Sequence, residues 1–252
     1  MNEAAKGTVL EKIAMSVKGR LDARKRTPHE FVKAFRTGGP HVIAEIKRKS
    51  PSAGALALDA DPVKVAGEYL ANGATAISVL TEPDYFHGSL EFLGQIRRAY
   101  PQALLLMKDF IIDEYQLMEG RLAGADAALL ILSLLDEEEF PRLLAFARSV
   151  GLSVLVEVHD EAELDRALKA GADLIGVNNR NLRTMEVSLD ISRALAKRFQ
   201  GNAVFICESG IKSGAEVRDL HKLGFAGFLV GSSLMSGGKP GEALKQLKAE
   251  AR

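Results

Sequence analysis

The chain has 252 residues, 47% of them hydrophobic and 26% charged, a balance typical of one globular domain of barrel size or of two smaller domains. Lysine plus arginine and aspartate plus glutamate each number 33, so the formal net charge is +0 and the basic excess of a nucleic-acid-binding protein is missing. The sequence has no apolar stretch of the roughly 18 residues of a membrane helix, no secretory pattern in its first residues, and a single cysteine, Cys207. We therefore expect a cytoplasmic protein with no nucleic-acid partner and no membrane partner.

Residues 1–40 predict a helical extension ahead of the main fold. Its first helix is indicated by apolar residues spaced along one face, namely Leu10, Ile13, Ala14 and Val17. A second helix is predicted to start at Thr27-Pro28-His29-Glu30, which offers an N-cap, a proline at the first helical position and a capping-box glutamate. Phe31, Val32 and Phe35 form its apolar stripe, and Gly38-Gly39-Pro40 ends it.

From His41 onward, short apolar runs alternate with longer amphipathic segments. The runs start about every 20–35 residues, the length of a strand, a helix and two loops, which favours repeated βα units and a parallel sheet. They predict eight strands, near residues 42–47, 76–80, 103–108, 127–131, 153–158, 174–178, 203–207 and 227–230.

A glycine precedes every second strand of this series, in the pairs Asn72-Gly73, Ala123-Gly124, Ala170-Gly171 and Leu223-Gly224. Glycine tolerates the left-handed conformation that ends a helix, so each pair predicts a helix C-cap before a strand. The recurrence favours a closed (β/α)8 barrel over an open, doubly wound sheet. We expect residues 1–252 to form a single domain, with residues 1–40 as its N-terminal helical extension.

The first predicted strand is unusual because it carries Glu45 and Lys47 on the same face as the apolar Ile43. Burying two charges is costly unless they pair or face a wet cavity, so this strand predicts the floor of a polar pocket. The alternative is a partly exposed ion pair at a strand end.

Polar residues also end four later strands. Each continues the row of alternate residues that faces the barrel interior. They are Lys108, Glu157, Asn178 and Glu208. In a barrel, the carboxyl ends of the strands surround one site, so these side chains are expected to converge with Glu45 and Lys47 as groups for proton transfer. Taken singly, each could instead be a solvated cap.

Two glycine–serine segments follow the last two strands, Ser209-Gly210 and Gly231-Ser232. Barrels often bind phosphate at this position through backbone N–H groups, so we expect a phosphate site there. Cys207 alternates away from Glu208 and is predicted to be a packed core thiol. Glu157 and His159 could share a face as metal ligands, but no other His or Cys lies at a matching strand end, and we expect no metal.

The first strand and its loop, residues 43–52, resemble the characteristic sequence of the indole-3-glycerol phosphate synthase family of barrel enzymes. Further segments resemble family motifs in the same order: Tyr85-Phe86-His87-Gly88-Ser89, Lys108-Asp109-Phe110, Glu157-Val158-His159-Asp160, Gly176-Val177-Asn178-Asn179-Arg180 and Glu208-Ser209-Gly210. The resemblance runs from about residue 1 to the end of the chain. It includes the helical extension, which in the family borders the active site.

The resemblance implies ring closure of 1-(2-carboxyphenylamino)-1-deoxyribulose 5-phosphate to indole-3-glycerol phosphate, with loss of carbon dioxide and water and without a cofactor. It implies that Lys108 is the general acid and that Glu157 acts as a base or stabilises positive charge. Glu45 and Lys47 are implied in proton transfer and dehydration, and Asn178 and Glu208 in positioning the intermediate.

For substrate binding, the resemblance implies three groups of residues. The phosphate is expected on Ser209, Gly210, Gly231 and Ser232. The substrate carboxylate and ring are expected near Ser50, Pro51, Ser52 and Arg180, with an apolar wall from Phe86, Phe110, Leu130 and Ile131.

Three other functions remain as alternatives. A Schiff-base aldolase would use Lys108 or Lys47 as its nucleophile. The isomerase of the same pathway uses a Cys and an Asp as its acid/base pair, and no such pair lies at the strand ends. A catalytically silent phosphate-binding module is the third. The expected partner is a phosphorylated small molecule, and the chain is expected to be a monomer or a weak homodimer.

Overall fold

The computed structural model describes residues 15, 28–50 and 54–251. Eight parallel strands form a closed barrel in the order β1-β10-β9-β8-β7-β6-β5-β4, and β1 pairs with both β10 and β4 to close it. The predicted barrel and all eight predicted strands are confirmed. The strands are β1 (His41–Ile46), β4 (Ala76–Leu80), β5 (Leu105–Lys108), β6 (Ala127–Ile131), β7 (Ser153–Val158), β8 (Leu174–Asn178), β9 (Val204–Glu208) and β10 (Gly227–Val230).

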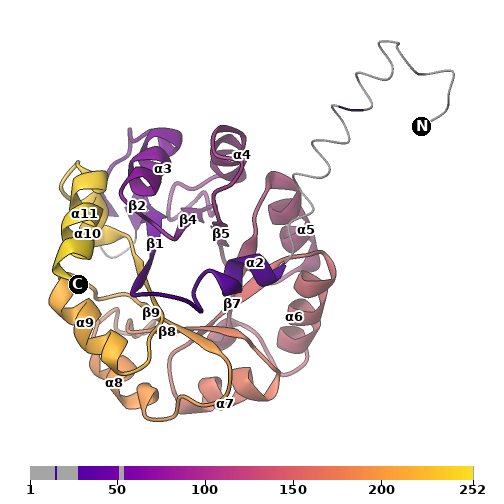
Figure 1. Cartoon of the computed structure of the whole chain (residues 1–252). Coiled ribbons are helices and arrows are strands. Elements are labelled where there is room, and N and C mark those ends of the chain that lie inside the picture. Colours follow the sequence, from indigo (N-terminus) through magenta and orange to yellow (C-terminus); the bar gives the residue numbers. More distant parts are fainter. Residues whose placement is uncertain (1–14, 16–27, 51–53, 252) are drawn as a thin grey trace, which may run out of the picture.

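Helices alternate with the strands and surround the barrel (Figure 1). Several begin at an aspartate or serine whose side chain accepts backbone N–H groups, as Asp113 and Ser213 do in capping boxes. The helices are α3 (Pro62–Ala71), α4 (Leu90–Ala99), α5 (Glu114–Ala123), α6 (Glu139–Ser149), α7 (Glu161–Lys169), α8 (Asp190–Ala196), α9 (Gly214–Lys222), α10 (Ser232–Met235) and α11 (Pro240–Glu250), with a 3-10 turn, η2 (Leu132–Leu134). Within the described ranges, no helix is long and apolar enough to cross a membrane.

The four glycines predicted to end helices all have positive φ angles. The values are 83° at Gly73, 109° at Gly124, 72° at Gly171 and 105° at Gly224. In each case the chain leaves a helix through this residue and enters the next strand, so the predicted C-caps are confirmed.

A small antiparallel hairpin follows β1 and was not predicted. It consists of β2 (Lys49–Ser50) and β3 (Gly54–Ala55), which pair Lys49 with Ala55 and Ser50 with Gly54. The hairpin begins three residues after β1 ends, so it follows the carboxyl end of this strand.

Alternation along each strand divides the core into two layers. Inner side chains such as Ile43, Leu106 and Leu155 fill the barrel, and outer ones such as Val42 and Cys207 pack under the helices. The prediction for Cys207 is confirmed: it is fully buried, lies 3.2 Å from Asn179 Nδ2, and burial raises its thiol pKa to about 11.

Helix α2 (Pro28–Lys33) confirms the second predicted helix, and its apolar stripe is buried. Phe31 and Phe35 join the inner layer, and Phe35 contacts His41 and lies beside Gly227 at the amino ends of β1 and β10. Helix α2 therefore closes the amino-terminal end of the barrel (Figure 1). The expectation that the extension borders the active site is therefore wrong for α2. The predicted site lies at the opposite, carboxyl-terminal end of the barrel. Thr27 and the first predicted helix lie outside the described residues.

Candidate active site

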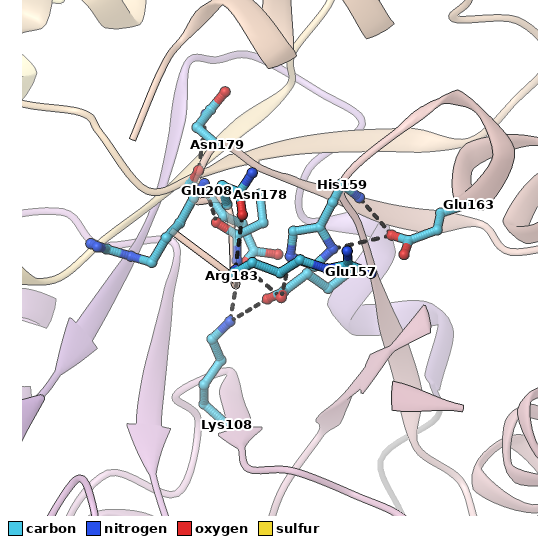
Figure 2. A network of polar contacts seen from close by, with 10 residues as sticks. Lys108, Glu157, His159, Glu163, Asn178, Asn179, Arg183 and Glu208 are labelled. Atoms are coloured by element: carbon cyan, nitrogen blue, oxygen red, sulfur yellow. Dashed lines mark hydrogen bonds and ion pairs between the residues drawn. The ribbon is translucent and has the colours of Figure 1, made fainter. Parts of the chain in front are cut away.

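Lys108, the last residue of β5, lies between two carboxylates from distant strands. Its Nζ donates to Glu157 Oε2 at 3.0 Å and to Glu208 Oε2 at 2.8 Å (Figure 2). The three side chains are 15%, 3% and 2% exposed, so they form a nearly dry cluster at the carboxyl end of the barrel. The predicted convergence of strand ends 49 and 100 residues apart is present.

The cluster shifts the proton affinity of each member. Burial disfavours the Lys108 ammonium, but Glu157, Glu208 and Glu45 outweigh it and raise the lysine pKa. Burial also opposes the Glu157 carboxylate, yet Lys108, His159 and Asn178 hold the pKa of Glu157 well below its usual range. Burial dominates at Glu208 and raises its pKa to about 7. Two carboxyl groups on one ammonium thus differ widely in acidity, as acid–base chemistry requires.

Glu45 and Lys47 form a second ion pair at the end of β1. Lys47 Nζ lies 2.7 Å from Glu45 Oε1, and the two side chains are 16% and 5% exposed. Glu45 also raises the pKa of Lys108 and of Glu208, so the charges of the two ion pairs interact. A Cβ at Gly231, directly after β10, would come within 2.5 Å of Glu45 Oε1, so a larger residue there would displace this carboxylate.

Asn178 and Gly176 of β8 hold the carboxylates in place. Asn178 Nδ2 donates to Glu157 Oε1 at 3.0 Å, leaving Oε2 for Lys108. Gly176 lies beneath Glu208 Oε1, and any Cβ there would overlap that oxygen. Glu208 Oε1 is buried and makes no hydrogen bond within the described part of the chain, so it can accept a donor from a bound molecule.

The two predicted phosphate segments lie next to each other. Ser209 and Gly210 follow β9 with φ angles of 63° and 88°, and the Ser233 hydroxyl donates to Ile211 O at 3.0 Å, which links this loop to the start of α10. Gly231 and Ser232 are at that start. The positive φ at Ser209 marks a strained backbone at a position expected to bind a ligand.

Asn179 was quoted only as part of a motif, and no role was predicted for it. Its side chain is fully buried and donates to Glu208 O at 2.9 Å and to Ser209 O at 3.2 Å, while its Oδ1 accepts Ser192 N–H at 3.0 Å. Asn179 therefore fixes the strained turn at Ser209. An asparagine directly after a strand-end polar residue was the only sequence signal.

The predicted apolar wall is only partly present. The Phe86 and Phe110 rings lie 5.9 Å apart between centroids, and Ile131 belongs to the inner layer beside Glu157 in the sheet register. Leu130 is wrong as a wall residue, because it packs in the outer layer under the helices. Successive strand residues face opposite sides, so Leu130 and Ile131 cannot both face the site.

The residues expected to hold the substrate carboxylate are less completely described. Arg180 is half-buried after β8, and its guanidinium donates to Met185 O at 3.0 Å within its own loop. Ser50 ends β2 of the hairpin. Pro51 and Ser52 lie outside the described residues.

His159 follows β7 and lies between two glutamates. Its Nε2 is 3.3 Å from Glu157 Oε1, and its Nδ1 is 3.1 Å from Glu163 Oε2 (Figure 2). Across residues 28–50 and 54–251, no three His, Cys, Asp or Glu side chains gather as a metal-binding group. The four-residue spacing of His159 and Glu163 could have indicated their contact.

A closed (β/α)8 barrel with buried ammonium and carboxylate groups at its carboxyl end is the arrangement of a barrel enzyme. The family model described as indole-3-glycerol phosphate synthase matches residues 3–247. The chain belongs to this family.

Two relatives illustrate the similarity. Indole-3-glycerol phosphate synthase of Albidiferax ferrireducens is 45% identical over 237 residues, covering 92% of this chain and 89% of the relative. The Campylobacter jejuni protein of the same name is 45% identical over 222 residues, covering 87% and 86%. The predicted family, a carboxy-lyase of tryptophan biosynthesis, is confirmed.

Solved structures agree on the fold. The 3-hexulose-6-phosphate synthase of Salmonella typhimurium superposes with a TM-score of 0.67 over 83% of this chain and 97% of that one, at 18% identity. A thiamine phosphate pyrophosphorylase from Pyrococcus furiosus superposes with a TM-score of 0.61 at 19% identity, over 82% and 93%. At these identities, the likeness concerns the barrel alone.

Proposed function

We propose that the cluster around Lys108 closes the indole ring of 1-(2-carboxyphenylamino)-1-deoxyribulose 5-phosphate, with loss of carbon dioxide and water. The observation that carries the proposal is the buried Lys108 ammonium, within 3.0 Å of Glu157 and 2.8 Å of Glu208. A weak carbon nucleophile needs an acid at the ketone oxygen and an anion near the cationic intermediate, and this cluster supplies both.

Binding fixes the two ends of the substrate. The phosphate is assigned to Ser209, Gly210, Gly231 and Ser232, whose loops the Ser233 hydroxyl links. The anthranilate ring is assigned to the surface formed by Phe86, Phe110 and Ile131, and its carboxylate to Arg180 with residues 50–52. Both reacting carbons belong to one substrate molecule, so holding its two ends restricts it to conformations in which these carbons are in contact.

Lys108 protonates the ketone oxygen as the aromatic carbon that bears the carboxylate attacks the ketone carbon. The new carbon–carbon bond leaves positive charge on the ring and nitrogen, which the ionised Glu157 stabilises. Loss of carbon dioxide then returns the bonding electrons to the ring. Glu157 suits this role because its pKa is held well below the usual range.

Dehydration completes the indole. The hydroxyl made from the ketone oxygen leaves as water after protonation, and the neighbouring ring CH2 group loses a proton to form the double bond. Glu45 and Lys47, paired at 2.7 Å, are assigned to these transfers. Asn178 and the buried Glu208 are assigned to positioning the sugar hydroxyls, and the free Glu208 Oε1 offers an acceptor for one of them.

The raised pKa of Lys108 argues against the Schiff-base alternative. A lysine nucleophile must be unprotonated, and three nearby carboxylates favour the ammonium of Lys108. The ammonium is suited to donating a proton and unsuited to attacking a carbonyl.

The test is turnover of the carboxyphenylamino substrate, followed by indole fluorescence. Turnover without a covalent adduct after borohydride treatment supports the proposal. A reduced lysine adduct would instead support the aldolase, and phosphate binding without turnover would support the silent module.

We also propose that the chain acts in the cytoplasm as a monomer or weak homodimer, with residues 1–252 as one domain. The single cysteine is buried and unpaired, which is compatible with a reducing compartment. Light scattering during turnover would measure the oligomeric state.

A further inference from the structure

The Glu157 carboxylate has its two oxygens in different environments. Oε2 accepts from Lys108, whereas Oε1 faces Asn178 Nδ2 at 3.0 Å and His159 Nε2 at 3.3 Å. Asn178 is neutral, so His159 is the second group, after Lys108, that can place a positive charge against this carboxylate. Glu157 is thus held at both ends.

His159 is itself fixed from outside the barrel. Glu163 of α7 accepts from His159 Nδ1 at 3.1 Å and from the His159 backbone N–H at 2.7 Å, through the same oxygen. The Asp160 side chain caps α7 and accepts the Glu163 N–H at 2.9 Å, so the first turn of the helix sets the position of Glu163. The connection therefore runs from α7 through the imidazole to the site (Figure 2).

Two carboxylates contact the His159 ring. Glu157 on its own strand and Glu163 on α7 face the ring, while η2, which also packs against β7, consists of Leu132, Ser133 and Leu134. Arg166 of α7 instead donates to Leu132 O, away from the imidazole. Burial opposes the imidazolium, but the two glutamates outweigh it and raise the His159 pKa to about 9.

We propose that His159 is a positioning residue for Glu157: as an imidazolium held by Glu163, it orients the carboxylate and keeps it ionised while Oε2 serves Lys108 and the substrate. The inference rests on the proposed role of Glu157. It differs from that role because His159 acts through the carboxylate, without touching the reacting atoms.

Asparagine and glutamine separate the two contacts of the ring. An asparagine amide can replace Nδ1 and keep Glu163 but cannot reach Glu157, whereas a glutamine amide can replace Nε2. His159→Asn should lower kcat about tenfold with KM changed less than about threefold, because the substrate contacts remain. It should also raise the pKa of Glu157, which carbon-13 NMR of labelled glutamate measures.

His159→Gln should recover most of the lost kcat, because its amide nitrogen takes the place of Nε2 beside Glu157 Oε1. Glu163→Gln, at a side chain 17% exposed, should shift kcat and the Glu157 pKa in the same directions as His159→Asn, and it carries the test should His159→Asn fail to fold. His221→Asn is the matched control, because that ring contacts Phe225 O at the far end of the barrel. Equal loss in His159→Asn and His159→Gln, or an unchanged Glu157 pKa in His159→Asn and Glu163→Gln, would overturn the proposal.

A Glu157→Gln background distinguishes this inference from the proposed function. If Glu157 has its assigned role, Glu157→Gln alone lowers kcat, and adding His159→Asn has little further effect because the two residues act as a unit. Normal turnover of Glu157→Gln would contradict the assigned role. Impaired Glu157→Gln with a fully active His159→Asn would contradict only the inference about His159.

Discussion

Lys108 has a high proton affinity because its neighbours are charged, although its surroundings are nearly dry. Burial alone would lower its pKa, yet Glu157 at 3.0 Å and Glu208 at 2.8 Å reverse the effect. Before substrate binds, the ammonium neutralises one of two buried carboxylates, and Glu208 has a pKa raised to about 7. The residue that we propose as the proton donor thus also holds the site together.

Lys108→Ala should lower kcat at least ~100-fold, the usual scale for a positioned general acid, and leave the barrel folded. Indole fluorescence measures the rate, and circular dichroism checks the fold. Lys222→Ala, on the outer helix α9, is the control and should keep normal turnover, because Lys222 is 74% exposed. Near-normal turnover in folded Lys108→Ala would remove this residue from the mechanism.

The pH dependence of stability should report on His159. Its folded-state pKa is about 9 against an ordinary value of 6.5, so its favourable contribution is fully present below about pH 6.5 and is lost as pH rises towards 9. The free energy of unfolding of the wild type should exceed that of His159→Asn most clearly near pH 6, and the difference should shrink by about pH 10. Urea unfolding at both pH values measures it. A constant difference would contradict the raised pKa.

At the scale of elements, the strands and their polar ends were predictable because each depends on local pattern. Apolar runs and helix-ending glycines such as Gly124 locate the strands, and the period of two identifies which side chain continues the inner row. Leu130 was wrongly predicted as a wall residue because this alternation was not applied to it. Its neighbour Ile131 occupies the inner row, so Leu130 must face outward. The β2–β3 hairpin was missed because two-residue strands leave no periodicity.

In strand β8, the site depends on the lack of a side chain at Gly176. A Cβ at Gly176 would overlap Glu208 Oε1, so Gly176→Ala should displace Glu208 from Lys108 and lower kcat by about tenfold or more. The control is Gly237→Ala, where a Cβ meets nothing within 4 Å. Steady-state kinetics on both variants makes the comparison. Equal activity would mean that Glu208 shifts without consequence.

The start of α10 should bind the phosphate through backbone N–H groups and the Ser232 hydroxyl. Ser232→Asp adds a negative charge there and should raise KM about tenfold or more by repulsion, with a smaller change in kcat. Ser236→Asp places the same charge at the exposed C-cap of α10 and should leave KM close to the wild-type value. An unchanged KM in Ser232→Asp would contradict the phosphate assignment.

At the scale of the whole molecule, the barrel separates stability from chemistry. The inner layer, from Phe35 through Ile43 to Ile131, links the two ends, with α2 closing one and the polar cluster occupying the other. The sequence predicted α2 as a helix with an apolar stripe but could not predict its partner, because a stripe shows which face is buried and leaves open what covers it. The contact between His159 and Glu157 could not be predicted from the sequence either. The orientation of the His159 ring depends on where α7 places Glu163.

This separation gives a prediction for α2. Phe31 is fully buried against the inner layer, so Phe31→Ala should lower the free energy of unfolding by about 3–5 kcal/mol. Because α2 lies at the amino-terminal end, kcat and KM of the folded variant should stay within about twofold of the wild type. Urea unfolding and active-site-normalised kinetics measure the two effects, and Leu122→Ala, at a side chain 58% exposed, is the control for stability. A large fall in kcat in folded Phe31→Ala would mean that packing at the closed end reaches through the inner layer to Lys108.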